Sequence, residues 1–193
     1  MITTKHLSFG YKSGKHVFSD LELSLPKGSI VGLLGRNGEG KTTLLKNLYG
    51  QLFSKEGEVD VLGFTPRERK VAFLQQVYML PEEIHVPQMT IRRYFDISAP
   101  FYPTYDEAVA QELIDVFGLD WKMDLKKISQ GQKKKALIAF ALALRVPLLL
   151  LDEPTNGLDI PSKGEFRRAV ARYLGEDQTL VISTHQVRDL EQL

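Results

Sequence analysis

The residues that best indicate chemistry form a glycine-rich loop in the first third of the chain. Residues 35–42 read Gly-Arg-Asn-Gly-Glu-Gly-Lys-Thr and lie between an apolar run at 30–34 and a segment at 43–48 that is typical of a helix. Glycines in such a loop let successive backbone N–H groups point at one anion, at the positive end of the helix dipole. The spacing therefore predicts a site for the phosphates of a nucleoside triphosphate.

Individual side chains of the loop have distinct expected roles. Lys41 suits the β- and γ-phosphates, and the Thr42 hydroxyl suits a Mg²⁺ ion. An ordinary turn between a strand and a helix is the alternative. With glycine at roughly 7% of residues, however, on the order of one random chain in a hundred of this length carries the pattern. The residues expected to bind the phosphates are Gly35, Asn37, Gly38, Gly40, Lys41, Thr42 and Thr43.

Two adjacent carboxylates, Asp152 and Glu153, follow the apolar run at 148–151. A parallel sheet presents its ligands at this end of a strand. There, Asp152 can hold the water shell of Mg²⁺, and Glu153 can polarise an attacking water, a role that contributes about a hundred- to ten-thousand-fold in rate. The alternative is an acidic pair that caps a turn before Pro154. The phosphate loop upstream favours the catalytic interpretation.

The elements that must position these groups begin with strands. Leucines alternate with polar residues at 21–25, so segments 2–9 and 17–25 are expected to pair as antiparallel strands. Two further strands are predicted at 57–63 and 70–74.

Helices and buried strands follow. Apolar residues at helical spacing predict helices at 106–117 and 132–144. The continuous apolar runs at 147–151 and 179–183 are typical of strands that a parallel sheet buries on both faces. Together these elements predict an α/β nucleotide-binding core with a helical subdomain inserted at about 90–145.

Composition narrows the class of protein. The 193 residues allow one substantial core, and 25 Lys and Arg against 24 Asp and Glu create no field that attracts nucleic acid or an anionic membrane. The absence of cysteine excludes disulfides and thiolate metal sites. The longest apolar tract, 136–151, is too short to span a bilayer, and the N-terminus lacks the apolar core of a signal peptide. We expect a soluble, cytoplasmic chain that binds no nucleic acid.

A second glycine-rich segment, Ile128-Ser129-Gln130-Gly131-Gln132, could be a further anion site or a serine N-cap followed by a helix. With the loop and the carboxylates in register, the whole chain resembles the ATP-binding subunits of ABC-type ATPases. The resemblance implies a P-loop NTPase core with a mostly parallel sheet, an antiparallel N-terminal β subdomain and a helical insertion. It also implies that Ser129, Gly131 and Gln132 bind the γ-phosphate of ATP held by an opposite subunit, in a head-to-tail dimer.

The same resemblance assigns roles to single residues. Tyr11 matches the aromatic residue that stacks on adenine, and Asp159 lies in the loop that crosses between subunits. His185 matches the histidine at the γ-phosphate, although a solitary histidine is more often structural. Gln76 resembles the glutamine that contacts Mg²⁺ and the attacking water, with Gln75 as its rival. The catalytic set is then Glu153, His185 and Gln76, the Mg²⁺ ligands are Thr42, Gln76 and Asp152 (the last through water), and the cofactors are ATP and Mg²⁺.

Three features depart from the family pattern or lie outside it. Glu39 occupies a loop position where small residues are usual, and its carboxylate would repel phosphates unless it points outward. Residues 133–135 are three lysines, which we interpret as a solvated helix face rather than a nucleic-acid site. The chain continues for only eight residues after His185, so we expect a single ATP-binding domain over 1–193 with a shortened C-terminal end.

Two classes of ATPase fit these motifs. The first is the energy-coupling subunit of a membrane transporter, peripheral on the inner face of the cell membrane, which dimerises with an identical or related chain and drives a separate transmembrane subunit. The second is a soluble ABC ATPase in nucleic-acid maintenance, ribosome-associated work or cluster assembly. The short interval between Gln76 and Ser129 lacks a long coiled coil. The aromatic and proline-rich stretch at 97–106 resembles a segment of bacterial export-type members, with an ordered hydrophobic linker between helices as the alternative. Both favour transport, while cargo and direction leave no mark in the sequence.

Overall fold

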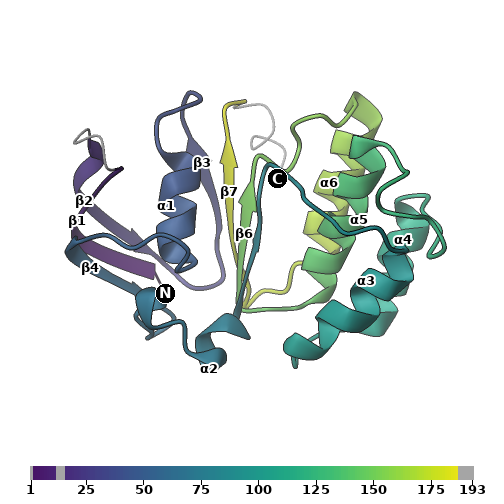
Figure 1. The fold of residues 1–193 in the computed structure, drawn as a ribbon, viewed down its shortest axis with the longest axis horizontal. Helices are drawn as coiled ribbons and strands as arrows, with labels where there is room; N and C mark the ends of the chain where they lie inside the picture. The colour runs from purple at the N-terminus through teal and green to yellow at the C-terminus, as the bar shows by residue number, and fades with distance from the viewer. Residues whose placement is uncertain (1, 12–15, 187–193) are drawn as a thin grey trace.

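The computed structural model describes residues 2–11 and 16–186 (Figure 1). An antiparallel sheet lies at one side, helix α1 (Lys41–Leu48) lies next to it, a parallel sheet occupies the middle, and helices fill the other side. The architecture is the predicted α/β core with an antiparallel N-terminal sheet and a helical insertion.

The antiparallel sheet has the strand order β2-β1-β4. Strands β1 (Ile2–Gly10) and β2 (His16–Leu25) pair antiparallel, as their alternating patterns predicted. On its other edge β1 pairs with β4 (Glu56–Val61), the strand predicted at 57–63.

The parallel sheet sets the position of the functional site. Its strand order is β3-β7-β6-β5, from β3 (Ile30–Leu34), β7 (Thr179–Thr184), β6 (Leu148–Asp152) and β5 (Val77–Leu80). Every residue of β6 and β7 is buried, which confirms the interpretation of the two continuous apolar runs. Because all neighbouring pairs are parallel, the loops that follow these strands meet at one edge of the sheet.

Strand β6 carries the core on both of its faces because successive side chains point to opposite sides. Leu148 and Leu150 pack in the cluster that contains Leu45 of α1. Leu149 and Leu151 pack in the cluster that includes α5 (Gln130–Ala143) and α6 (Ile160–Tyr173).

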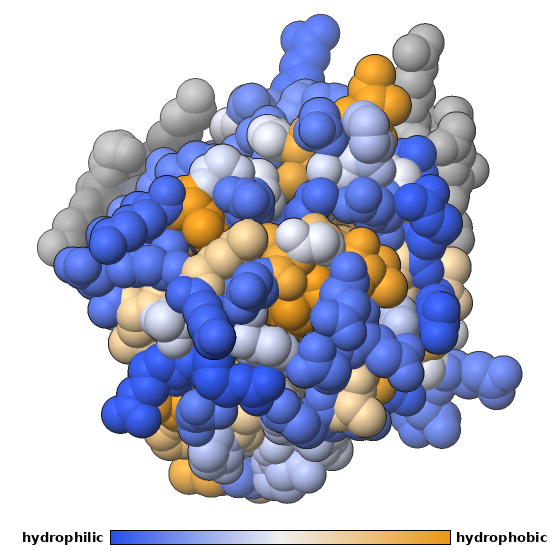
Figure 2. Space-filling view, turned by 90° about the vertical axis from the view of Figure 1, so that its right-hand side faces the viewer, coloured by the Kyte–Doolittle hydropathy of each residue, from blue (hydrophilic) through white to orange (hydrophobic). Residues whose placement is uncertain are grey.

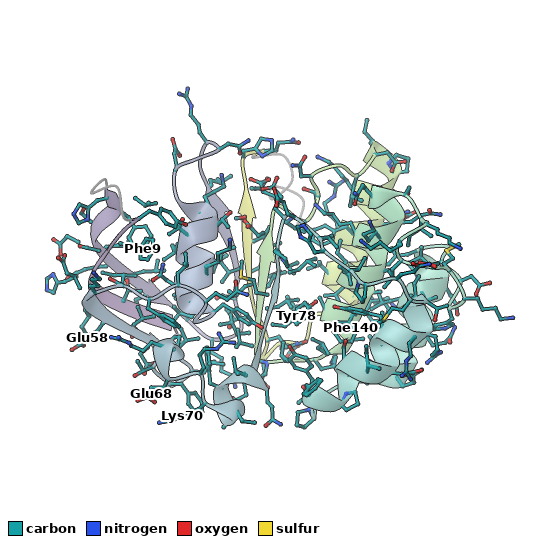
Figure 3. The ribbon with its side chains drawn as sticks, in the orientation of Figure 1. Phe9, Glu58, Glu68, Lys70, Tyr78 and Phe140 are labelled. Carbon is teal, nitrogen blue, oxygen red and sulfur yellow. The ribbon has the colours of Figure 1, made fainter. Side chains whose placement is uncertain are left out.

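The helical insertion consists of α3 (Ile91–Ser98), the short 3₁₀ helix η2 (Ala99–Phe101), α4 (Glu107–Val116) and α5. Its centre is Phe140, whose ring centroid lies 4.9 Å from that of Phe95 and 5.8 Å from that of Tyr78 in β5. Figure 3 shows Tyr78 and Phe140 side by side, where the sheet meets the insertion. Aromatic packing thus fixes the insertion against the core.

The segment at 70–74 is not a strand, contrary to the prediction. It forms helix α2 (Val71–Leu74), which follows the 3₁₀ helix η1 (Pro66–Glu68), and the strand begins only at Val77. Val71 is 70% exposed while Phe73 is buried. A short apolar run does not distinguish a helical turn from a strand by periodicity alone.

The hypothesis of a solvated lysine face at 133–135 is also wrong. Lys133 and Lys134 are 9% and 6% exposed, and Lys135 forms an ion pair with Glu165 of α6, with 2.7 Å between Nζ and Oε2. The first residue of α5, Gln130, is exposed, but the lysines that follow it in the helix pack mainly against other segments of the chain.

Candidate nucleotide-binding site

The glycine-rich loop connects β3 to α1, as predicted. Gly38 and Gly40 have φ of 86° and 95°, in the left-handed region where a Cβ is strained. A Cβ on Gly40 would also lie 2.4 Å from Cγ1 of Val17. Glycine at these positions therefore lets the loop close tightly before the first turn of α1.

The side chain of Lys41 lies inside the glycine-rich loop and crosses it. Its side chain is 9% exposed, and Nζ donates hydrogen bonds to the carbonyls of Gly35 at 2.7 Å and Arg36 at 3.1 Å. The same ammonium lies 3.5 Å from Oε1 of Glu153. A buried cation is thus held at the centre of the loop, where an anionic ligand would exchange for these carbonyls.

Asp152 links the carboxyl ends of two strands to the loop. Thr42 Oγ1 donates to Asp152 Oδ2 at 2.7 Å, and Ser183 Oγ of β7 donates to Oδ1 at 2.5 Å. Asp152 is 1% exposed, so these hydroxyls satisfy a buried carboxylate. The Thr42–Asp152 pair is a set of oxygen donors of the kind that Mg²⁺ prefers.

Glu153 is the strained residue of the site. It is 4% exposed and has a φ of 46°, a conformation that costs a non-glycine residue about 1–3 kcal/mol. Its Oε2 lies 2.9 Å from Nδ1 of His185, which follows β7. Its Oε1 accepts no hydrogen bond from the described residues. A buried oxygen of this kind is available to a water molecule or a ligand.

A pocket of about 270 Å³ lies between these groups and the N-terminal sheet. Tyr11, 51% exposed, stands at its rim, and the Tyr11 hydroxyl lies 3.1 Å from Thr43 Oγ1. The ring of Tyr11 also makes an edge contact with Phe9, with centroids 5.2 Å apart. The described lining residues are Tyr11, Val17, Asn37, Gly38, Gly40, Lys41, Thr42, Thr43, Glu82 and Glu153.

Glu39 does not point into this pocket. Its Oε2 accepts a hydrogen bond from the backbone N–H of Arg36 at 2.7 Å. The residue lines a separate hollow that it shares with Leu34 and His185. The Glu39 carboxylate therefore stabilises the outer side of the glycine-rich loop and does not face the expected phosphate position.

The structure does not bring Gln76 to the site, which corrects the prediction. Gln76 precedes β5, whose first residue, Val77, pairs with Leu148 at the start of β6. It therefore lies at the opposite end of the sheet from Asp152 and Glu153. Its Nε2 donates to the carbonyl of Ala72 at 2.8 Å. The rival, Gln75, lies one residue further back.

Glu82 is the residue that sequence reasoning missed. It follows β5 at the carboxyl edge of the sheet and lines the pocket with Lys41 and Glu153. The signal that could have identified it is the apolar run at 77–80, which ends in Pro81. A strand at 70–74 points to Gln76 as the polar residue at its end, whereas the strand at 77–80 places Glu82 there.

The second glycine-rich segment begins α5. Ser129 Oγ accepts from the backbone N–H of Gln132 at 3.1 Å, and Gln132 Oε1 accepts from the backbone N–H of Ser129 at 3.1 Å, a capping box. Asp159 caps α6 and accepts from Ser162 N at 2.8 Å; the side-chain and backbone hydrogen bonds of Ser162 lower the pKa of Asp159. The described residues that line the nucleotide pocket include neither Ser129 nor Asp159.

The fold and this site together define an ABC-class ATPase cassette. The family model described as "ABC transporter" matches residues 18–156. The chain is 30% identical over 194 residues to the ABC transporter ATP-binding protein YtrB of Bacillus subtilis, covering 100% of this chain and 66% of that protein. It is 34% identical over 200 residues to the bacitracin transport ATP-binding protein BcrA of Bacillus licheniformis, covering 100% and 64%. The chain belongs to the ABC transporter family.

Solved structures show the same fold. An ATP-binding subunit of an ABC transporter superposes with a TM-score of 0.90 at 25% identity, over 100% of this chain and 82% of that one. A dimeric ATP-binding cassette, MJ0796, in a post-hydrolysis state with ADP and Pi superposes with a TM-score of 0.87 at 21% identity, over 100% and 91%. The chain spans about two thirds of the length of the curated relatives it matches.

Proposed function

We propose that the chain binds and hydrolyses MgATP as the energy-coupling subunit of an ABC transporter, with one ATP-binding domain over residues 1–193. The observation that carries the proposal is the convergence of Lys41, Asp152 and Glu153 at the carboxyl edge of the parallel sheet. One buried cation and two buried carboxylates meet there, beside a glycine loop that can accept phosphates.

The residues present fit a bound Mg²⁺ ion. Thr42 would ligate it directly, and Asp152 would hold its water shell. A bound Mg²⁺ ion supplies charge neutralisation on the phosphates. Lys41 would bind the β- and γ-phosphates, exchanging its carbonyl partners for phosphate oxygens.

Glu153 and His185 would act on the water that attacks the γ-phosphate. Glu153 orients this water and accepts its proton through Oε1, which accepts no hydrogen bond from the described residues and lies 3.5 Å from the Lys41 ammonium. Because an ionised carboxylate only accepts, the 2.9 Å contact places the proton on His185 Nδ1 and holds the ring beside the site. His185 then stabilises the charge that develops on the transferred phosphoryl group.

Tyr11 would stack on the adenine at the rim of the pocket. Ser129, Gly131 and Gln132 would act in trans, on the γ-phosphate of ATP in a second copy or a related chain. Asp159 would lie in the loop that crosses between the two subunits. Such a dimer would explain why the N-terminus of α5, with Ser129, is not among the described residues that line the nucleotide pocket of its own chain.

The partner in transport would be a separate membrane-spanning subunit, which places the chain on the inner face of the cell membrane. No helix among the described residues is both long and apolar enough to cross a bilayer. The insertion offers a docking surface, since Ile97 and Phe101 are 40% and 70% exposed beside a hollow of about 370 Å³. Figure 2 shows apolar side chains gathered on the side of the molecule that the insertion forms.

The test is purification of the tagged full-length protein from native cells, in parallel from detergent-solubilised membranes and from cytosol. We expect a stoichiometric multi-span membrane protein to co-elute from the membrane fraction, as judged by mass spectrometry. Recovery only from cytosol, with ribosomes, nucleic-acid enzymes or a soluble scaffold, would overturn the transport assignment and leave the ATPase assignment standing.

A further inference from the structure

Close to its N-terminus, α5 carries a buried lysine that the nucleotide chemistry does not use. Lys134 is 6% exposed, although lysine is almost never buried without partners. It lies five residues after Ser129, the first residue of the second glycine-rich segment at 129–132, hereafter the signature segment. Its position on the inner side of the helix needs an explanation beyond packing.

The ammonium of Lys134 binds the turn that carries the catalytic glutamate. Nζ donates to the carbonyl of Glu153 at 2.9 Å and to the carbonyl of Asn156 at 2.9 Å. The backbone N–H of Asn156 also donates to the Glu153 carbonyl at 3.1 Å, so Lys134 closes a tight turn from its inner side. These bonds fix the backbone of Glu153 in its left-handed conformation, with a φ of 46°.

Burial and the neighbouring carboxylates act on the pKa of Lys134 in opposite directions. Burial lowers the pKa of Lys134, while Glu82, Glu153 and Asp152 raise it. Carbonyl oxygens accept the hydrogen bonds, and the three carboxylates balance the charge. A charged donor shared by two carbonyls is stronger than a neutral one.

The same turn holds the loop that follows β5. Asn156 Nδ2 donates to Glu82 Oε1 at 2.8 Å. A hollow of about 420 Å³ lies beside these groups, and Gln130 and Gly157 also line it. Three segments therefore meet at Lys134. They are helix α5, which begins with the signature segment and is called the signature helix below, the turn at 153–156 that carries Glu153, and the loop after β5 that carries Glu82.

We propose that Lys134 is a positioning residue that links the signature helix to the Glu153 turn and holds this turn in the geometry that the reaction needs. The inference rests on the proposed function, in which the signature segment contacts the partner's ATP and Glu153 acts on ATP of its own chain. Lys134 then carries the state of one nucleotide site to the other within a single subunit.

The first test compares Lys134→Met with wild type in nucleotide binding and turnover. Lys134 does not line the nucleotide pocket, so ATP affinity should stay unchanged. A displacement of about 1 Å at a catalytic group lowers the rate by on the order of a hundredfold, so kcat should fall by about ten- to a hundredfold. Lys134→Arg, which keeps the charge and the donors, should recover part of this loss. Lys122→Met, at an exposed lysine of the same insertion, is the matched control.

A second measurement does not depend on activity. Amide hydrogen exchange in Lys134→Met should accelerate in residues 153–158 and stay unchanged in the phosphate loop at 35–42. Wild-type exchange in 153–158, or wild-type kcat in the folded variant, would overturn the proposal. If Lys134→Met does not fold, the same two readings on Lys134→Gln decide, because this shorter, uncharged side chain also loses the ammonium that bonds to both carbonyls. Wild-type protein without ATPase activity would instead refute the proposed function, and the exchange data would still decide the role of Lys134.

Discussion

Lys41 lies where three anionic or dipolar groups converge, because the carbonyls of Gly35 and Arg36 and the carboxylate of Glu153 all face its ammonium. The spacing of the loop predicted this position directly. Glycine, lysine and threonine at fixed intervals constrain the backbone so strongly that the side chains have few alternative placements. The same holds for Asp152 and Glu153, whose location follows from the buried strand before them.

Replacement of Lys41 by alanine should weaken ATP binding at least about tenfold, since a hydrogen bond to a charged group contributes about 1.5–3 kcal/mol. Titration with a fluorescent ATP analogue measures the effect. Lys46→Ala, in the last turn of the same helix, is the control and should bind like wild type. Equal affinities for both variants would show that Lys41 does not contact the phosphates.

The structure places Glu82, and not Gln76, beside the nucleotide pocket, which gives a second prediction for single residues. Gln76→Ala should keep wild-type kcat, because the side chain bonds to Ala72 at the far end of the sheet. Glu82→Ala should lower kcat, because Glu82 lines the pocket beside Glu153. Steady-state ATPase assays on the two variants compare them directly. The reverse order of effects would restore the family assignment of Gln76.

At the scale of elements, apolar runs of equal length predicted two buried strands correctly and one strand wrongly. The runs at 147–151 and 179–183 became β6 and β7, because a strand buried on both faces tolerates no polar residue in its middle. The run at 70–74 became α2, since Val71 and Ala72 are exposed, Phe73 is buried and Leu74 is half-buried against the core. The burial of Lys134 could not be predicted from the three consecutive lysines. Lys134 is buried because it bonds to the turn at 153–156, which is distant in sequence.

Caps show how local sequence fixes the ends of the inserted helices. Asp106 Oδ1 accepts from the backbone N–H groups of Ala108 at 3.0 Å and Val109 at 3.1 Å, at the start of α4. Asp106→Ala should cost about 1 kcal/mol of unfolding free energy, which lowers Tm by about 2–4 °C in a chain of this size. Thermal unfolding followed by circular dichroism measures it, with exposed Lys122→Ala as control. An unchanged Tm would show that the cap does not stabilise α4.

At the scale of the whole molecule, the parallel sheet brings the loop after β3 together with the ends of β6 and β7, and this single edge holds the cation, the carboxylates and His185. The signature segment lies elsewhere, at the start of α5. Composition agrees with such a molecule, because a net charge of +1 gives no field toward nucleic acid. In the proposed function, a site divided in this way is completed by a second chain, and ATP between the two chains would supply most of the contact.

The measurement that tests this account most directly is the mass of Glu153→Gln in solution, by size exclusion with light scattering, with and without MgATP. Without its base the variant should bind ATP and not turn it over, so the sandwich should persist. We predict a species of twice the 21.9 kDa chain mass with MgATP and a monomer without nucleotide. Wild type should return to monomer as it hydrolyses ATP. A Glu153→Gln variant that stays monomeric with MgATP, or hydrolyses ATP at the wild-type rate, would contradict the account.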